Sequence, residues 1–324
     1  MSNTLDIRRL YLQLPGTARP VLAGIDLTVA ARETVALVGE SGSGKTLTSR
    51  SVLRLLPRGA VARGSVLVGG EDVLTMAPPQ LRRLRTRTAA MIFQDPRAAI
   101  NPLRRIGDFL TESLRPSAGG DAADRRAAAM LEAVGLTAGA LRQYPGQLSG
   151  GMLQRVMIAA ALMGDPGLIL ADEPTTALDV TTQAEVVALL GDLQQRFGTG
   201  LLFVTHDLGL AAAISDRVYV MYAGRIAETG SAETLFNHPR HPYTAALLQS
   251  TPRLDAPRGR LAAIDGQPPS LREALTGCPF APRCRYATAI CTEEMPEQLP
   301  VAGDPGHRTA CHHSDQVTGG APHE

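Results

Sequence analysis

Residues 33–46 read Glu-Thr-Val-Ala-Leu-Val-Gly-Glu-Ser-Gly-Ser-Gly-Lys-Thr, and this stretch decides the fold. The apolar run before Gly39 predicts a buried strand, and the segment from Thr46 to Leu56 predicts a helix that ends at Pro57. Between them the chain has the spacing G-x-x-x-x-G-K-[ST], in which glycines let successive backbone N–H groups point into one concavity. The positive end of the following helix adds to this attraction for anions. The stretch therefore predicts a phosphate-binding loop in an α/β domain.

The residues of this loop have distinct expected roles. Lys45, the single lysine of the chain, is expected to reach the β- and γ-phosphates of a nucleotide, and the Thr46 hydroxyl is expected to coordinate Mg²⁺. The predicted nucleotide contacts from this segment are Gly39, Ser41, Gly42, Ser43, Gly44, Lys45, Thr46 and Thr48.

A second apolar segment supplies two carboxylates. Leu168 to Ala171 predicts a buried strand that ends in Asp172 and Glu173. A carboxylate at the end of such a strand can hold Mg²⁺ opposite Thr46, and the next carboxylate can polarise an attacking water. Asp172 is therefore the predicted magnesium ligand, and Glu173, together with Lys45, is predicted to be catalytic.

Strands alternate with helices along most of the chain, which is typical of an α/β domain with a largely parallel sheet. The N-terminal segment adds two strands, at residues 10–14 and 21–29. Residues 104–164 contain helical patterns and no convincing strand, so we predict a helical insertion over about residues 100–165. From Pro252 onward, prolines, glycines and all four cysteines punctuate the chain and regular periodicity ends.

Composition narrows the function classes. Hydrophobic residues make up 44% and charged residues 19% of the 324 residues, which excludes a disordered or collagen-like chain. The formal net charge is only +1, so bulk charge does not favour binding to nucleic acid. No stretch approaches the ~20 apolar residues that span a bilayer, and the N-terminus lacks the pattern of a secretory signal. A cytosolic location is expected.

Further motifs follow in a fixed order. Leu148-Ser149-Gly150-Gly151-Met152 is followed by Gln154 and precedes the two carboxylates. Gln94 lies in Ile-Phe-Gln-Asp-Pro, Asp179 lies shortly after the carboxylates, and His206 follows the strand Leu-Phe-Val-Thr. With these motifs in this order, residues 1–240 resemble the ATPases of the ABC type.

The resemblance implies a role for each of these residues. Ser149, Gly150, Gly151 and Gln154 begin a helix, which makes a second anion site. In this family that site closes on the ATP of a second cassette, so two cassettes form a head-to-tail dimer, with Asp179 at the seam. His206 would contact the γ-phosphate and assist the catalytic carboxylate. Gln94 would join the Mg²⁺ shell and sense the nucleotide.

One position departs from the family pattern. Family members usually present an aromatic residue at the end of the first strand to stack on adenine, and the matching position here is Leu14. Tyr11 lies nearby but, at the period of two of a strand, faces the other side. Tyr11 is kept as the candidate adenine contact, with a plain strand tyrosine as the alternative.

Several strings narrow the resemblance to the ATPase subunits of dipeptide and oligopeptide importers (Opp/Dpp type), a group that includes nickel importers. The most diagnostic is His238-Pro-Arg-His-Pro-Tyr-Thr244, with which the group's C-terminal extension begins. The resemblance implies an ABC ATPase domain at residues 1–240, an extension at residues 241–324, and ATP hydrolysis that drives import of peptides, nickel or another small solute. It also implies a peripheral position on the cytoplasmic face of the inner membrane. The implied partners are two transmembrane permease subunits, a second ATPase subunit (sister or identical) and an extracytoplasmic solute-binding protein.

The four cysteines, Cys278, Cys284, Cys291 and Cys311, lie in this extension. Four thiols in a loop-rich cytosolic segment suit zinc or an iron–sulfur cluster rather than disulfides, and their spacing alone does not choose between the two. Several ATPases of this importer group carry the same pattern, and in some it holds a [4Fe–4S] cluster, so the resemblance favours that cluster. Zn²⁺ and unligated thiols are the alternatives. His307, His312 and His313 are expected to be solvated tail residues.

Two other functions are weighed against this one. Soluble ABC ATPases that act on ribosomes or DNA usually hold two ATPase domains or a long coiled-coil insertion, whereas this chain has one set of motifs. Its arginine run between Arg82 and Arg87 is expected to be a solvated helix face with Leu81 and Leu84 inward, so no nucleic-acid partner is predicted. A purely regulatory role is disfavoured by the presence of Glu173 and His206.

Overall fold

A computed structural model describes residues 3–114, 119–176, 178–250 and 264–317. The chain forms two compact units, each assembled from separate segments. The first unit comprises residues 1–6, 28–34 and 67–204, and the second comprises residues 7–27, 35–66 and 205–324.

The first unit contains a parallel sheet in the order β6-β7-β8. β7 (Leu168–Asp172) lies between β6 (Ala89–Ile92) and β8 (Gly200–Thr205) and runs parallel to both. Every residue of β7 and β8 is buried, as continuous apolar runs predict for strands covered on both faces. β7 therefore carries Asp172 to the carboxyl end of the sheet, opposite Val204 of β8.

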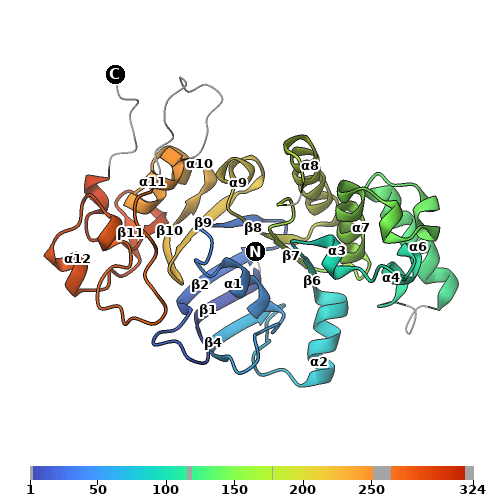
Figure 1. The fold of residues 1–324 in the computed structure, drawn as a ribbon, viewed down its shortest axis with the longest axis horizontal. Coiled ribbons are helices and arrows are strands. Elements are labelled where there is room, and N and C mark those ends of the chain that lie inside the picture. The colour runs from blue at the N-terminus through green and yellow to red at the C-terminus, as the bar shows by residue number, and fades with distance from the viewer. Residues whose placement is uncertain (1–2, 115–118, 177, 251–263, 318–324) are drawn as a thin grey trace. The chain divides into compact units, whose positions relative to one another are not determined.

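Helices supply most of the rest of this unit, and between residues 100 and 165 its described residues form helices and no strand, as predicted. α6 packs against α4 and α7, and these helices lie beside one another (Figure 1). The helix bounds are α2 (Pro78–Arg83), α3 (Pro96–Ala99), α4 (Ile106–Thr111), α6 (Gly120–Ala133), α7 (Gly150–Leu162) and α8 (Val180–Phe197), with short helical turns at Leu84–Thr88, Ala138–Arg142 and Pro145–Gln147. The arginine run forms the expected solvated face, because Leu81 and Leu84 are buried while Arg82, Arg83, Arg85 and Arg87 are exposed.

The second unit contains strands in the order β11-β12-β10-β9-β3. β3 (Thr34–Val38) pairs in parallel with β9 (Arg217–Tyr222), and β9 pairs antiparallel with β10 (Arg225–Ser231). β12 (Asp304–Thr309) then pairs antiparallel with β10 and with the edge strand β11 (Leu299–Val301). The cysteine-bearing extension thus adds a hairpin to the same sheet as the strand that precedes the phosphate loop.

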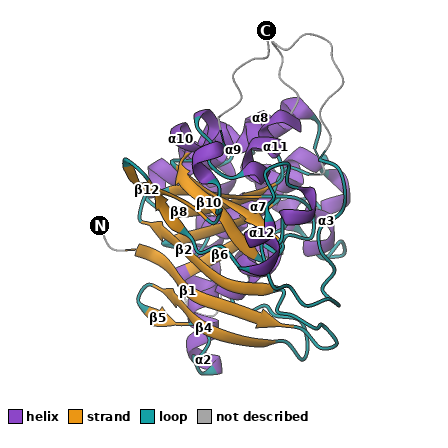
Figure 2. Ribbon diagram, turned by 90° about the vertical axis from the view of Figure 1, so that its left-hand side faces the viewer, coloured by secondary structure: helices purple, strands orange, loops and turns teal. Residues whose placement is uncertain are grey.

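Helices and most residues of a second sheet complete this unit. The helices are α1 (Lys45–Val52), α9 (Leu208–Ile214), α10 (Ala232–Asn237), α11 (Pro242–Ser250) and α12 (Ala289–Glu293), with short helical turns at Ala281–Arg283 and Ser314–Gln316. The second sheet has β1 (Asn3–Gln13), β2 (Leu22–Ala30) and β4 (Val61–Val68) side by side in the order β2-β1-β4 (Figure 2). At residues 67–72, in the first unit, the end of β4 pairs antiparallel with β5 (Glu71–Asp72).

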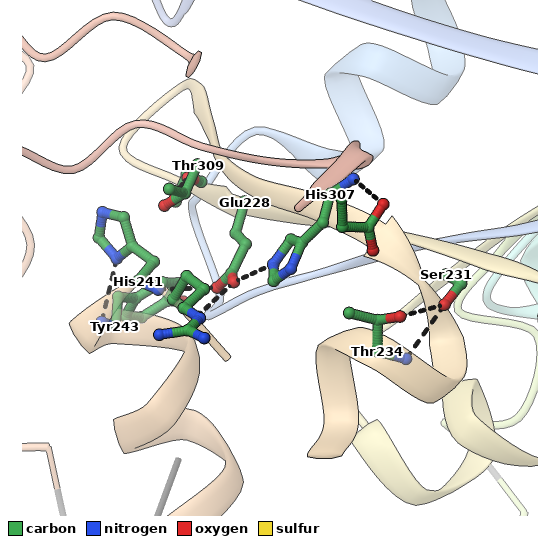
Figure 3. A network of polar contacts seen from close by, with 10 residues as sticks. Glu228, Ser231, Thr234, His241, Tyr243, His307 and Thr309 are labelled. Carbon is green, nitrogen blue, oxygen red and sulfur yellow. Dashed lines mark hydrogen bonds and ion pairs between the residues drawn. The ribbon is translucent and has the colours of Figure 1, made fainter. Parts of the chain in front are cut away.

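A buried carboxylate joins β10 and β12 (Figure 3). Glu228 of β10 is 0% exposed, and its Oε1 lies 2.6 Å from Nε2 of His307 on β12. The same carboxylate accepts the backbone N–H groups of Arg240 at 2.5 Å and His241 at 3.0 Å, directly before α11. Because an ionised carboxylate can only accept, His307 is the donor in this pair. The expectation that His307 is a solvated tail residue is wrong: it is 1% exposed and ties β12 to the sheet.

His241 is itself enclosed beside this pair. It is 3% exposed, and its Nδ1 accepts the backbone N–H of Tyr243 at 3.0 Å. Burial lowers the pKa of His241 to about 4, against a smaller opposing effect of the Glu228 charge. His241 is therefore neutral at physiological pH and acts as an acceptor at the start of α11.

Candidate functional site

The phosphate loop connects β3 to α1 and wraps tightly against the end of β9. Gly39 has φ +151°, and a Cβ there would lie 2.2 Å from the carbonyl oxygen of Met221. Gly44 has φ +110°, and its Cβ would lie 2.7 Å from the Met221 Cε. The loop is pinned further where Gly224 N–H donates to the Ser43 carbonyl at 2.8 Å. Only glycine fits at positions 39 and 44, as the motif predicts.

Polar groups of the loop converge on its own backbone. Lys45 is 4% exposed, and its Nζ donates to the carbonyls of Gly39 at 2.8 Å and Glu40 at 3.0 Å. Ser43 Oγ is buried and has no hydrogen-bond partner among the described residues. Thr48 is fully buried, and its hydroxyl donates to the Gly44 carbonyl at 3.1 Å, so it supports the start of α1. A buried amine and an unsatisfied hydroxyl in a glycine cradle fit a bound phosphate chain.

In the first unit, Glu173 directly follows β7 with a left-handed backbone, φ +47°. Its N–H donates to the Val204 carbonyl at 2.9 Å, and its carboxylate Oε2 accepts Gln94 Nε2 at 3.3 Å and Thr176 Oγ1 at 3.1 Å. Strained backbone of this kind persists where neighbours hold it and is concentrated at functional sites. The structure thus brings the predicted base and the predicted sensing glutamine together, one residue from the buried Asp172.

Helix α7, which follows the Leu-Ser-Gly-Gly motif, and helix α8 both begin with side-chain caps. Ser149 Oγ accepts the N–H of Met152 at 3.3 Å, and Asp179 accepts the N–H and the hydroxyl of Thr182 at 3.0 and 2.8 Å. Both hydrogen bonds lower the pKa of the Asp179 carboxyl, and the one from the Thr182 backbone N–H is the larger cause. A Cβ on Gly151 would lie 2.8 Å from the Thr182 Cγ2, so glycine allows the starts of α7 and α8 to approach closely. On α7, Gln154 is buried, and its Nε2 has no partner among the described residues.

The other predicted nucleotide residues lie in the second unit. His206 is exposed in the turn between β8 and α9, where Asp207 caps α9 by accepting the Leu210 N–H at 3.1 Å. Tyr11 is 41% exposed and lines a cavity of about 600 Å³ with Arg225, Phe280 and other residues of this unit. None of the described residues that line this cavity comes from the phosphate loop. The role of Tyr11 at adenine stays a prediction.

The predicted metal ligands differ in how well they fit. Thr46, Gln94 and Asp172 offer hydroxyl, amide and carboxylate oxygens, which are the ligands that Mg²⁺ prefers. The four cysteines are free thiols that line one small cavity together with His312 and His313. Within the described ranges, however, no group of three or more His, Cys, Asp or Glu side chains is arranged to hold a metal ion. The thiol chemistry fits a metal or iron–sulfur site, whereas the arrangement of the sulfurs does not.

Two of the four thiols have local hydrogen bonds with the backbone. Backbone N–H groups of Tyr286 and His313 donate to the sulfurs of Cys284 and Cys311, both at 3.4 Å. Burial raises the pKa of Cys284, and that of Cys311 to about 12. These thiols are protonated at neutral pH as they stand, and a bound metal ion would have to displace the protons.

Comparisons with known proteins assign the chain to a family. A family model described as ABC transporter matches residues 22–176, and one described as oligopeptide/dipeptide transporter, C-terminal region, matches residues 227–291. The oligopeptide transport ATP-binding protein of Haemophilus influenzae is 43% identical over 297 residues, which is 90% of this chain and 92% of that protein. This chain belongs to the ATP-binding subunits of oligopeptide and dipeptide ABC transporters. The probable D,D-dipeptide transport ATP-binding protein of Escherichia coli is 44% identical over 320 residues, 96% of this subunit and 97% of that protein.

The subunit spans about half the length of its mycobacterial relatives. The oligopeptide transport ATP-binding protein of Mycobacterium tuberculosis is 44% identical over 327 residues, which is 98% of this chain and 53% of that protein. Solved structures show the same fold. CbiO1 of Clostridium perfringens has a TM-score of 0.65 at 22% identity and covers 74% of this chain and 92% of its own. An ATP-binding cassette solved as a post-hydrolysis dimer with ADP and Pi has a TM-score of 0.62 at 26% identity, covering 70% of this chain and 98% of its own.

The ABC-type α/β fold and the importer-type resemblance predicted from the sequence are therefore confirmed, while the domain boundary near residue 240 stays a prediction. Among the described residues, no helix is both long and apolar enough to cross a bilayer.

Sequence reasoning missed one set of contacts at the phosphate loop. Glu40 occupies a variable position of the motif, and its carboxylate pairs with Arg283 of the extension. Tyr243 lies in the His-Pro-Tyr-Thr string, and its hydroxyl accepts the backbone N–H of Glu40. The one available signal was an ionisable residue inside a loop that must bind anions, which calls for a compensating cation.

Proposed function

We propose that this chain hydrolyses ATP to energise the import of peptides across the cytoplasmic membrane. The observation that carries the proposal is that one chain joins a full set of ABC nucleotide motifs to a C-terminal region of the oligopeptide/dipeptide transporter type. Relatives named for oligopeptide and D,D-dipeptide transport support a peptide cargo. Nickel or another small solute is the alternative cargo of the same machinery.

The residues divide the chemistry among them. The loop N–H groups and Lys45 bind the phosphates, and His206 contacts the γ-phosphate. Thr46, Gln94 and Asp172 would hold Mg²⁺, which screens the phosphate charge when bound. Glu173 accepts a proton from the attacking water while the water oxygen bonds to the γ-phosphorus. The bond from that phosphorus to the bridging oxygen breaks, and ADP and phosphate leave.

Transport requires partners that convert this reaction into movement. Ser149 caps α7, which begins with Gly150 and Gly151, and the N–H end of this helix suits the phosphates of a second cassette. Asp179, the cap of α8, would lie at the seam between the two cassettes. ATP would then join two cassettes, identical or sister. Two permease subunits would form the path, an extracytoplasmic protein would deliver the solute, and the cassettes would sit on the cytoplasmic face of the membrane.

A pull-down tests the assembly. The tagged full chain is purified from native membranes in mild detergent, and its companions are identified by mass spectrometry. Two polytopic permeases and a second ATPase are expected. Ribosomal or DNA-repair proteins without any membrane protein would refute the importer. The purified complex, placed in liposomes loaded with ATP, should take up a labelled peptide, and uptake of nickel alone would favour the alternative cargo.

For the extension, the proposed group at the four cysteines is a [4Fe–4S] cluster, with Zn²⁺ as the alternative. The support is that all four thiols line one small cavity. The sulfurs would have to draw together around the group. Iron, labile sulfide and zinc are measured on protein purified without oxygen. Stoichiometric zinc without sulfide would refute the cluster.

A further inference from the structure

We propose that the cysteine-bearing extension supports the phosphate loop at Glu40, where Arg283 offsets the charge of the carboxylate and, as positioning residues, Arg283 and Tyr243 hold Glu40 in place. The inference rests on the proposed binding of ATP and goes beyond it, because it assigns part of that binding to residues outside the ABC motifs. All of the residues concerned belong to the second compact unit.

The Arg283 guanidinium is bound at every N–H. Nη1 and Nη2 donate to the two carboxylate oxygens of Glu40 at 2.8 and 2.9 Å, a two-pronged ion pair. Its remaining N–H groups donate to the carbonyls of Asp265 and Ile264 and to the hydroxyl of Tyr222, at 2.8 to 3.1 Å. The Arg283 side chain is only 4% exposed and the Glu40 side chain 23% exposed, so the arginine end of the pair is largely shielded from water.

The backbone of Glu40 is held as well as its side chain. Its N–H donates to the Tyr243 hydroxyl at 2.8 Å, and its carbonyl accepts Lys45 Nζ at 3.0 Å and the Ser43 N–H at 3.2 Å. One residue therefore connects the extension with the loop lysine. A shift of Glu40 would move the carbonyl on which Lys45 rests.

The extension is itself firmly packed at this point. Tyr243 is fully buried, and its ring centroid lies 4.6 Å from that of Tyr222 and 5.4 Å from that of Phe280. Arg283 directly precedes Cys284, and Phe280 lies two residues after Cys278. The folded state of the cysteine segment is thereby linked to the phosphate loop.

The negative charge of Glu40 determines in which direction the loss of Arg283 should change nucleotide binding. A carboxylate in a loop that binds a triphosphate repels its ligand unless a cation offsets it. Arg283 is that cation. Removal of Arg283 should weaken nucleotide binding, and neutralising Glu40 in the same chain should restore much of it. A loss that came only from damaged packing would not be restored in this way.

The test compares full-length variants by calorimetric titration with Mg·ATP and by steady-state ATPase kinetics. We expect Arg283→Met to raise Kd and KM for ATP on the order of tenfold, with a smaller change in kcat. The double variant Arg283→Met, Glu40→Gln should return to within about threefold of wild type. Arg285→Met is the matched control, because Arg285 lies on the other side of Cys284, is exposed and donates to Tyr286. It should bind as wild type does.

Wild-type Kd for Arg283→Met, or a double variant no better than the single one, would overturn the inference. If Arg283→Met does not fold, Arg283→Lys is used. Lysine keeps the charge but not the two-pronged geometry, so a Kd about threefold above wild type is expected, and a wild-type Kd overturns the inference.

A wild-type chain that does not bind Mg·ATP at all would overturn the proposed function together with this inference. Normal wild-type binding with an indifferent Arg283→Met overturns the inference alone.

Discussion

Replacing Glu228 with glutamine should destabilise the second unit strongly. The wild-type carboxylate is wholly buried and accepts three donors, from Arg240, His241 and His307, at 2.5 to 3.0 Å. A glutamine keeps one acceptor oxygen and turns an N–H group toward a donor that then has no partner. Leaving a buried donor without its acceptor costs about 1–3 kcal/mol. At about 2–4 °C per kcal/mol, the value for a unit of roughly 150–250 residues, the Tm of the second unit should fall by about 5 °C.

Urea unfolding followed by far-UV circular dichroism gives the free energy, and hydrogen exchange locates the loss. Amides of β10, β12 and the start of α11 should exchange faster in Glu228→Gln, because these are the segments that the carboxylate joins. Glu293→Gln, an exposed change of the same chemistry at the end of α12, should alter stability by no more than about 0.5 kcal/mol. A loss below about 1 kcal/mol in Glu228→Gln, or exchange that rises equally everywhere, would show that the carboxylate does not join these segments.

Three further changes test the nucleotide site and the titration of a buried histidine. Glu173→Gln should bind ATP like wild type but hydrolyse it about 10²–10⁴-fold more slowly, because it cannot accept the proton of water; near-normal turnover would remove Glu173 as the base. Gly39→Ala, whose methyl group would meet the Met221 carbonyl at 2.2 Å, should raise the Kd for ATP at least about tenfold in titrations, whereas Gly42→Ala, with open space around it, should do less. His241 has a folded pKa of about 4, below its unfolded value of about 6.5, so the unfolded chain binds the extra proton and stability falls by about 3 kcal/mol as pH drops from 6.5 to 4. His241→Asn, which keeps an acceptor for the Tyr243 N–H, should show a shallower fall in urea midpoint over that range; an unchanged slope would contradict the burial effect.

Local signals explain what could be predicted from the sequence. The phosphate loop and the apolar run of β7 carry their structural reasons within a few residues, since glycine geometry and strand burial are local properties. The β11–β12 hairpin could not be predicted in this way. Its residues include Pro300, Gly303 and Pro305, and four of the six in β12 are not buried, so no apolar alternation marks it. Its partner is β10, about 80 residues earlier in the chain, and His307 is buried only because Glu228 meets it there.

Contacts between distant segments were equally hard to predict at the nucleotide site. Glu173 and Gln94 could both be assigned to the nucleotide site in advance because their motifs follow the order of the ABC family, and they meet in the structure, whereas Arg283 and Glu40 are 243 residues apart. Glu40 lies in the phosphate loop and Arg283 directly precedes Cys284, but neither motif indicates that it contacts the other. The two residues meet because Tyr243 and Phe280 of the extension pack onto Tyr222, a contact that no local sequence pattern predicts.

The edge strand β11 has a consequence for how these chains can associate. An unpaired strand edge is a template on which a foreign strand can grow, and long flat edges invite aggregation. β11 offers only three residues, and the middle one is Pro300, which has no N–H to give to an incoming strand. The hairpin thus closes this side of the sheet with a poor template. Copies of this chain that collide at this edge gain few backbone hydrogen bonds there, which limits growth of the sheet by strand addition.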